Sequence, residues 1–127
     1  MATKRAWTFS SFEDLEAKYA DGLFDCNDIA EISDPMILDW CERLSDWAPK
    51  VALCFNLSTS NVTLDRMSQC EMAEVRRLVC YHPNVSMETL ERLQYDGDRD
   101  IRETASEYLD RKTRSSRPRA RSRYTRA

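Results

Sequence analysis

The residues with the clearest chemical potential lie at the end of this 127-residue chain. Residues 111–127 contain eight basic and no acidic side chains, whereas residues 1–110 contain 11 basic and 22 acidic ones. Arginine and lysine neutralise phosphates with little sequence preference, and a tyrosine can stack on an exposed base. The candidate binding residues are Arg111, Lys112, Arg114, Arg117, Arg119, Arg121, Arg123, Tyr124 and Arg126. This segment predicts contact with a nucleic acid or with another acidic partner.

Other roles for the basic segment stay open. Residues 1–110 carry a net charge of −11, which would repel the same polyanion that the segment attracts. The arginines could instead keep the protein in solution, fold back onto its acidic body, or bind an acidic protein. Arg76, Arg77 and Arg102 lie near the starts of expected helices and could extend a nucleic-acid site. Solvated positions on a helix face account for them equally well.

The acidic body is itself a candidate surface, for docking onto a basic protein. Tryptophan is enriched among the residues that contribute most to binding, which makes Trp7, Trp40 and Trp47 the candidates. Core packing is the alternative role for each of them. Trp47 differs because it lies at an expected helix end, just before Pro49. We therefore expect Trp47 to be the anchor for a protein partner.

The sequence contains no group of residues with catalytic spacing. Its only histidine, His82, occupies an expected turn, where a structural hydrogen bond is favoured over proton transfer. There is no G-x-S-x-G motif, and the two glycines, Gly22 and Gly97, cannot form a phosphate-binding loop. The sequence predicts a protein that is not an enzyme and that has no cofactor.

The five cysteines are dispersed, without a C-x-x-C pair, at Cys26, Cys41, Cys54, Cys70 and Cys80. Most of them fall at or beside apolar helix positions, where a free thiol packs as a small hydrophobic group. An odd number also disfavours a disulfide framework. Cys80 and His82 would supply only half of a usual structural zinc site, so no metal site is predicted.

Helix-start signals precede several apolar stripes. Ser10 stands three residues before Glu13, a capping-box spacing that predicts a short helix over residues 11–21. Pro35 and Pro49 are placed to open two further helices, because proline is tolerated in the first helical turn.

Two serines mark later helices in the same way. Ser60 and Ser86 stand at matching places, where a hydroxyl can cap the following helix. Gly97 interrupts the pattern, and residues 101–109 give the last apolar stripe. From residue 111 onward the chain holds too little apolar surface to offset the entropy of ordering, so residues 111–127 are predicted to be disordered.

These elements belong to a unit that recurs about every 25 residues, a spacing typical of stacked helical repeats. Residues 56–67 can be laid over residues 82–93, which places Asn56 opposite His82. A fainter copy covers residues 33–44. Each copy is followed by the start of a second helix, so pairs of short helices are expected. Arrays of this kind usually bind other macromolecules through an extended face.

The repeats resemble the leucine-rich repeat variant family, a relative of HEAT-like helical repeats. The matching residues are His82, Pro83, Asn84, Leu90, Arg92, Leu93, Asp96, Ile101 and Arg102. The copy at Asn56 departs from the pattern, since Leu57 replaces the proline and Met67 replaces the leucine. The resemblance covers about residues 33–109. It implies an all-α, right-handed superhelix in which a helix alternates with a shorter 3-10 helix. Only Cys26 precedes the first copy, so the cluster-binding segment of some members is not implied.

Together these observations predict an all-α fold, a short right-handed α-solenoid of about three repeats. Its expected parts are a leader with a capping helix over residues 1–32, helical repeats over 33–110, and the disordered arginine-rich tail over 111–127. No apolar run is long enough to span a membrane and no secretion signal is evident, so a cytoplasmic protein is expected. A homodimer is possible, since so few repeats leave the ends of the stack short of cover.

The function expected is non-catalytic binding to a protein partner, in the manner of a bacterial or phage-encoded modulator of a larger machine. The alternative is a nucleic-acid-binding accessory protein that acts through the basic tail. Partner, host and oligomeric state are not specified by the residues.

Overall fold

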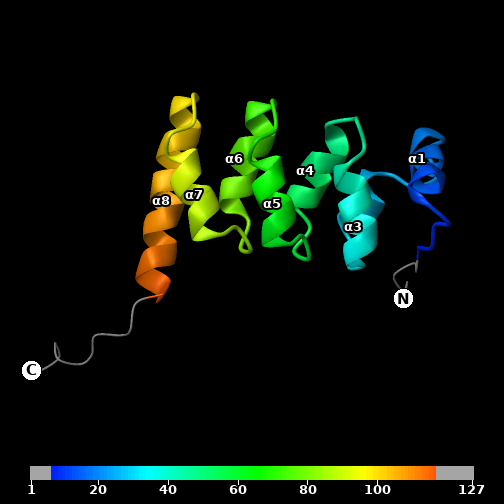
Figure 1. Cartoon of the computed structure of the whole chain (residues 1–127), viewed down its shortest axis with the longest axis horizontal. Helices are drawn as coiled ribbons and strands as arrows, with labels where there is room; N and C mark the ends of the chain where they lie inside the picture. Colours follow the sequence, from blue (N-terminus) through cyan, green and yellow to red (C-terminus); the bar gives the residue numbers. More distant parts are fainter. Residues whose placement is uncertain (1–6, 117–127) are drawn as a thin grey trace, which may run out of the picture.

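The computed structural model describes residues 7–116, and this part of the chain is entirely helical (Figure 1). It contains eight α-helices and no strand within those residues. The helices are α1 (Phe12–Ala20), α2 (Cys26–Ile29), α3 (Pro35–Glu42), α4 (Ala48–Cys54), α5 (Asn61–Met67), α6 (Ala73–Tyr81), α7 (Met87–Leu93) and α8 (Arg99–Ser116). The all-α prediction is confirmed.

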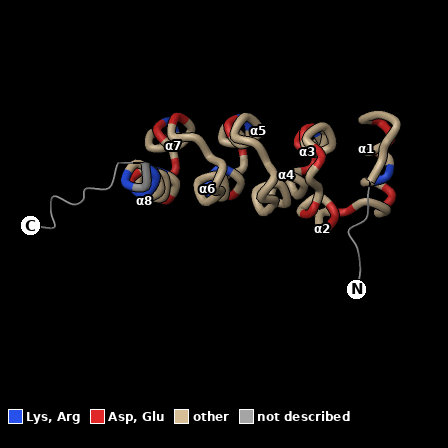
Figure 2. The backbone as a smooth tube through the Cα atoms, turned by 90° about the horizontal axis from the view of Figure 1, so that it is seen from below, with Lys and Arg blue, Asp and Glu red and all other residues tan. Residues whose placement is uncertain are grey.

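The helices lie in two layers. Figure 2 shows α3, α5 and α7 in one row and α2, α4, α6 and α8 in a second row beside it. Neighbours pack within the second layer, α2 on α4, α4 on α6 and α6 on α8, and the layers pack on each other through α3 with α4, α5 with α6, and α7 with α8. Helices α1 and α8 lie at opposite ends of the longest axis (Figure 1).

Caps form at the expected starts of α3, α5 and α7. The Asp34 carboxylate accepts hydrogen bonds from the backbone N–H groups at the start of α3, and Pro35 is the first residue of that helix. Ser60 and Ser86 each accept a hydrogen bond from the backbone N–H three residues later, at 3.2 and 3.1 Å. Each cap satisfies a backbone donor that the helix itself cannot. Pro49 is the second residue of α4 rather than its first.

The first two helices differ from expectation in detail. The cap of α1 is Ser11, whose hydroxyl accepts a hydrogen bond from the Asp14 N–H, while the N–H of Ser10 donates to the Asp14 carboxylate. The cap is thus shifted by one residue from the predicted pair of Ser10 with Glu13. The predictions also missed α2, although Asp25 and Asp28 form a reciprocal capping box that the sequence contains.

One continuous apolar core joins the two layers. Leu53, Leu64, Val79 and Leu90 come from α4, α5, α6 and α7 and are almost completely buried. Burying each such side chain stabilises the fold by about 1.5–3 kcal/mol relative to exposing it. At the N-terminal end, Phe24 is fully buried beneath the stacked rings of Trp7 and Phe9.

Two expectations about the later part of the chain are revised. Helix α8 continues to Ser116, so residues 111–116 are helical where a disordered tail was predicted from residue 111. Arg111 and Arg114 form ion pairs with carboxylates one turn earlier, which supports this extension of the helix. Residues 117–127 lie outside the described residues. In addition, both helices of each repeat are α-helical, whereas the family resemblance implied a 3-10 helix in alternation.

Candidate binding surfaces

The turns between repeats are joined by buried hydrogen bonds. The Asn56 side chain donates to the carbonyl oxygens of Ile29 and Ile32, each at 2.7 Å. His82, placed 26 residues later, contacts the Asn56 carbonyl oxygen through Nε2 at 2.7 Å, and its Nδ1 accepts from the Asn84 N–H at 3.0 Å. Because Nδ1 accepts, the proton resides on Nε2. Both ring nitrogens of His82 thus form hydrogen bonds within the fold, which is the structural role expected for this residue.

A second series of bonds links the two helices of each repeat. Lys50, Arg76 and Arg102, spaced 26 residues apart, donate to the backbone carbonyl oxygens of Leu44, Cys70 and Asp96, which are also 26 residues apart. Each cation therefore satisfies carbonyl groups left free after a first-layer helix ends. Lys50 and Arg76 each make a further such bond, to Glu42 and Glu71.

Two of the three arginines that were expected to extend a nucleic-acid site are held by such bonds. Arg76 also forms a two-pronged ion pair with Asp96, at 2.7 and 3.1 Å, and the Asp96 side chain is only 8 % exposed. Burial acts to raise the pKa of Asp96, but hydrogen bonds from the Arg76 guanidinium and the Asp98 N–H, together with the charges of Arg76 and Arg102, outweigh it. The pKa of this carboxyl therefore lies below its usual value. Arg76 and Arg102 are thus bonded within the body. Arg77 lies closer to the surface and pairs with Glu74.

The first layer carries its own series of ion pairs. Arg66 on α5 reaches Asp39 and Glu42 on α3, and Arg92 on α7 reaches Asp65 on α5. Hydrogen bonds from Thr89 and Arg92 lower the pKa of Asp65. Sequence reasoning did not predict these pairs, although Asp39 with Arg66 and Asp65 with Arg92 have the same spacing and were visible as a repeat.

The second layer carries an apolar hollow between α2 and α4. It has a volume of about 410 Å³ and is lined by Cys26, Asn27, Ala30, Trp47, Ala48, Val51, Ala52 and Phe55. Trp47 is 51 % exposed and Phe55 is 65 % exposed. The exposure predicted for Trp47 is observed, whereas Trp7 and Trp40 are partly buried against the core. The anchoring role of Trp47 stays a prediction.

A carboxylate lies at the margin of the hollow. The Tyr19 hydroxyl donates to Asp46 at 2.8 Å and lies 3.9 Å from the sulfur of Cys26, which places Asp46 near that lining residue. Burial, together with these contacts, raises the pKa of Tyr19. Glu31, next to the lining residue Ala30 in sequence, is exposed. The hollow is thus apolar inside and acidic nearby.

The corresponding groove between α6 and α8 is charged. It has a volume of about 430 Å³ and is lined by Arg77, Leu78, Tyr81, Asp100, Glu103, Thr104 and Glu107. The groove residues on α8 are Asp100, Glu103, Thr104 and Glu107. They follow at twice the 26-residue spacing the residues that line the apolar hollow from α4 and its C-terminal cap, namely Ala48, Val51, Ala52 and Phe55. Val51 and Phe55 are thereby replaced by Glu103 and Glu107. The two grooves therefore occupy equivalent positions in the sequence repeat, but one is lined by charged side chains and the other by apolar side chains.

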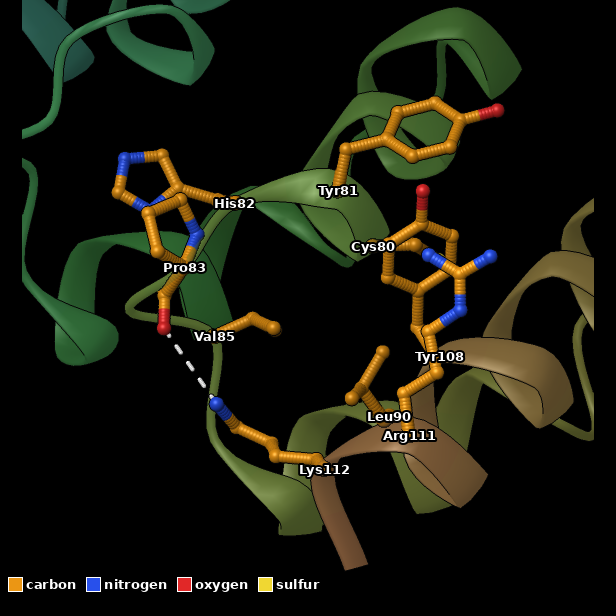
Figure 3. Close-up of a pocket in the computed structure, with 9 residues that line it drawn as sticks. All are labelled: Cys80, Tyr81, His82, Pro83, Val85, Leu90, Tyr108, Arg111 and Lys112. Atoms are coloured by element: carbon orange, nitrogen blue, oxygen red, sulfur yellow. Dashed lines mark hydrogen bonds between the residues drawn. The ribbon is translucent and has the colours of Figure 1, made fainter. Parts of the chain in front are cut away.

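A third hollow lies where the basic segment begins. Figure 3 shows Tyr108, Arg111 and Lys112 of α8 facing the turn that follows α6, and the hollow has a volume of about 270 Å³. Arg111 pairs with Glu107 at 2.6 Å and stacks on the Tyr108 ring, 4.8 Å from its centroid. Lys112 donates to the Pro83 carbonyl oxygen at 3.3 Å.

The described cations of the basic segment therefore have partners within the chain, since Arg114 also pairs with Asp110 at 3.0 Å. The remaining predicted contact residues lie outside the described residues: Arg117, Arg119, Arg121, Arg123, Tyr124 and Arg126. The described cations of the segment lie in the last turns of α8, whereas Trp47 immediately precedes α4.

Charge is distributed unevenly along the chain. Residues 7–47 contain 11 acidic and two basic side chains, whereas residues 48–116 contain 11 acidic and ten basic ones. In Figure 2 acidic positions gather around α1, α2 and the start of α3, and basic positions gather at the end of α8. Most of the negative charge thus lies at the end of the molecule that carries the apolar hollow.

The cysteines divide by burial. Cys41, Cys54 and Cys80 are buried, and burial raises the pKa of these thiols to about 12, 12 and 11. They are therefore protonated thiols at neutral pH. Cys26 and Cys70 are partly exposed.

No helix among residues 7–116 is both long and apolar enough to cross a membrane. No protein-family model, curated protein or solved structure matches this chain.

Proposed function

We propose that this protein is a non-catalytic helical-repeat protein that docks onto a protein partner through the hollow between α2 and α4. The proposed architecture is a short right-handed α-solenoid similar to the leucine-rich repeat variant family. The observation that carries the proposal is the exposure of Trp47 and Phe55, at the two ends of α4, in one hollow lined largely by apolar residues. Exposed aromatic anchors in concave sites are typical of residues that dominate binding energy.

The distribution of hydrogen bonds supports this assignment. His82, Asn56, Lys50 and Arg76 are all bonded to neighbouring parts of the body. We infer that these polar groups serve to stabilise the stacking of repeats. The side chains facing outward from the second layer vary between repeats, and they are the groups that can distinguish one partner from another.

A capture experiment from lysate of the source organism tests the proposal. The full chain, a variant with Trp47→Ala and Phe55→Ser, and a matched control with Tyr95→Ser would be immobilised in parallel. Tyr95 is 85 % exposed and lies in the α7–α8 turn, far along the array from the hollow. We expect a discrete protein to be retained by the full chain and the control, with nuclease present, and to be lost from the double variant.

The alternative is a nucleic-acid-binding accessory protein that acts through the basic segment, and the same experiment separates the two. Its support is the presence of five arginines and no acidic residue in residues 117–127. Recovery that disappears with nuclease or with added salt, and that is unaffected by the double variant, would favour this alternative. It would also contradict docking through the hollow.

A further inference from the structure

We propose that the hollow between α2 and α4 binds the arginine-rich residues 117–127 of a second copy of the same chain, so that copies associate head to tail. This inference goes beyond the proposed function, because it requires no external partner. It rests on charge complementarity, on the chemistry of the lining residues, and on the length of chain that follows α8.

The charges of the two partners are opposite and well separated along the molecule. Residues 7–47 carry a net charge of −9, and residues 117–127 carry +5. Residues 48–116 are close to neutral, with a net charge of −1. Helices α2 and α8 lie toward opposite ends of the array (Figure 2). Attraction between the negative end of one copy and the positive end of another is therefore the dominant long-range interaction between copies.

The hollow suits arginine more closely than lysine or a purely apolar side chain. A guanidinium group stacks on aromatic faces, and Trp47 and Phe55 provide two exposed ones. The methylene groups of arginine can pack on Val51, Ala52 and the rest of the apolar lining. Asp46 is placed near Cys26 at the margin, where its carboxylate can accept hydrogen bonds from the guanidinium.

A second copy can place more of the segment in the hollow than the same copy can. Packed helices lie about 8–10 Å apart, so α6 and α4 separate α8 from the hollow by about 20–25 Å. Eleven extended residues span at most about 36–40 Å. Within one molecule, more than half of the segment would be used to cross the second layer. In a second copy the whole segment is available to the hollow.

The geometry of such an association is open-ended. The surfaces in contact are different on the two copies, and a contact of this type does not close on itself unless the rotation between copies forms a ring. Association should therefore increase progressively with concentration and decrease with salt. An external partner at the same hollow would compete with the segment.

The test uses the full chain in sedimentation velocity over about a hundredfold range of concentration, at about 0.05 M and about 0.5 M salt. We expect the average mass to rise with concentration at low salt and to remain that of a monomer at high salt. A variant with Arg119→Gln, Arg121→Gln and Arg123→Gln, and a separate variant with the single change Trp47→Ala, should each weaken association about tenfold or more. Arg99→Gln, which removes one exposed cation from α8, is the matched control and should have little effect.

A spectroscopic measurement identifies the surface involved. With fluorine-labelled tryptophan in the full chain, the Trp47 resonance should shift as concentration rises, whereas that of the partly buried Trp40 should not. A synthetic peptide of residues 117–127 should reverse the association, and a peptide with glutamine at each arginine should not. A monomer under all conditions, association that survives the triple variant, or a Trp47 resonance that stays constant during association would each overturn the inference.

The two proposals can fail separately. If the triple arginine variant is monomeric and still captures the protein partner, the proposed function holds independently of self-association. If the full chain is monomeric at low salt but captures a partner through Trp47, the head-to-tail inference is wrong and the proposed function stands.

Discussion

The groove between α2 and α4 and the groove between α6 and α8 occupy equivalent places two repeats apart, yet one is apolar and the other is charged. Val51 and Phe55 line the first, and Glu103 and Glu107 occupy the same positions in the second. The helices that carry them are held to the preceding turns by equivalent bonds, from Lys50 and Arg102 to backbone carbonyl oxygens. The difference between the grooves therefore comes from outward-facing side chains and not from the way the repeats stack.

The comparison also separates stability from recognition. Where the chain repeats its hydrogen bonds, as at Asn56 and His82, the groups are buried and substitution should destabilise the protein. Where equivalent positions carry different side chains, as at Phe55 and Glu107, the side chains are exposed and substitution should alter binding with little change in stability. Five predictions test this division, beginning with the largest expected effect on stability.

Substituting Arg76 by Met should lower the free energy of unfolding by about 2–4 kcal/mol, because the nearly buried Asp96 carboxylate would lose its ion pair. Arg77→Met is the matched control, since it removes the same type of side chain one position later from a more exposed pair. Its effect should be about 0.5 kcal/mol or less. Urea unfolding monitored by circular dichroism measures both. Equal losses for the two variants would contradict the proposed importance of the Arg76–Asp96 pair.

Substituting Asn56 by Ala should cost about 2–3 kcal/mol, since two carbonyl oxygens in a buried turn would lose their donor. Asn84 also donates two bonds to the preceding turn, to Leu57 and Thr59, but it is exposed. Water can replace those bonds, so Asn84→Ala should cost about 1 kcal/mol or less. The same unfolding experiment ranks the pair. A larger loss of unfolding free energy for Asn84→Ala than for Asn56→Ala would show that burial does not determine the importance of these bonds.

The stability of the α6–α8 end should depend on acidity through Asp96. The pKa of this group is lowered from its usual value of 3.8 in the folded protein, so the unfolded chain takes up a proton first as the pH falls. The stabilising contribution is thus complete above the unfolded value and is lost as the pH falls through the folded value. Asp96→Asn should be less stable than the natural chain at pH 7, and the difference should shrink below about pH 4. Unfolding curves across this range provide the measurement, and a constant difference would argue against the assignment.

Exchanging the chemistry of the grooves should change stability little. Val51→Glu with Phe55→Glu gives the α2–α4 hollow the residues found at Glu103 and Glu107. The loss in unfolding free energy should be about 1 kcal/mol, because Phe55 is largely exposed and Val51 is partly exposed. Capture of the protein partner should nevertheless be abolished. Retained capture by a folded double variant would show that the hollow is not the docking surface.

Chemical labelling should distinguish the two partly exposed thiols without altering the fold. Cys26 lines the apolar hollow and Cys70 does not, so an occupant of the hollow should slow alkylation of Cys26 alone. The buried thiols of Cys41 and Cys54, with pKa values raised to about 12, should react later than either. Mass spectrometry of digested protein at successive times measures these rates. Equal protection of Cys70 would place the occupant elsewhere.

Many helix starts could be predicted because capping residues occur at the places where the sequence repeat also predicts a helix to begin. Asp34 before Pro35, and Ser60 and Ser86 before their helices, specify starts through backbone donors that need a partner. The short helix α2 was missed because it has only one buried apolar residue, Ile29, and so gives no periodic stripe. The extension of α8 was missed because the charge of its arginines was weighed without the carboxylates one turn earlier.

The candidate site was predictable only in part. Trp47 could be singled out from its place before Pro49, but the hollow around it combines α2 with α4, two elements separated in sequence by a turn and by the whole of α3. Arg76 and Arg102 were considered as surface cations because a sequence does not reveal which carbonyl groups a helix end leaves unsatisfied. Their regular spacing from Lys50 was the available signal.

The bonds between neighbouring repeats also bear on how the chain reaches its folded state. Each of these hydrogen bonds joins two residues that are 24 to 27 positions apart in the sequence. The donors or contacting side chains are those of Asn56, His82, Asn84, Arg66 and Arg92. The entropy lost on closing a loop depends on its length, so each docking step has nearly the same entropic cost. Chains dominated by contacts at short sequence separation fold rapidly. We expect folding to begin at any adjacent pair of these units and to spread in either direction, without waiting for the two ends of the chain to meet.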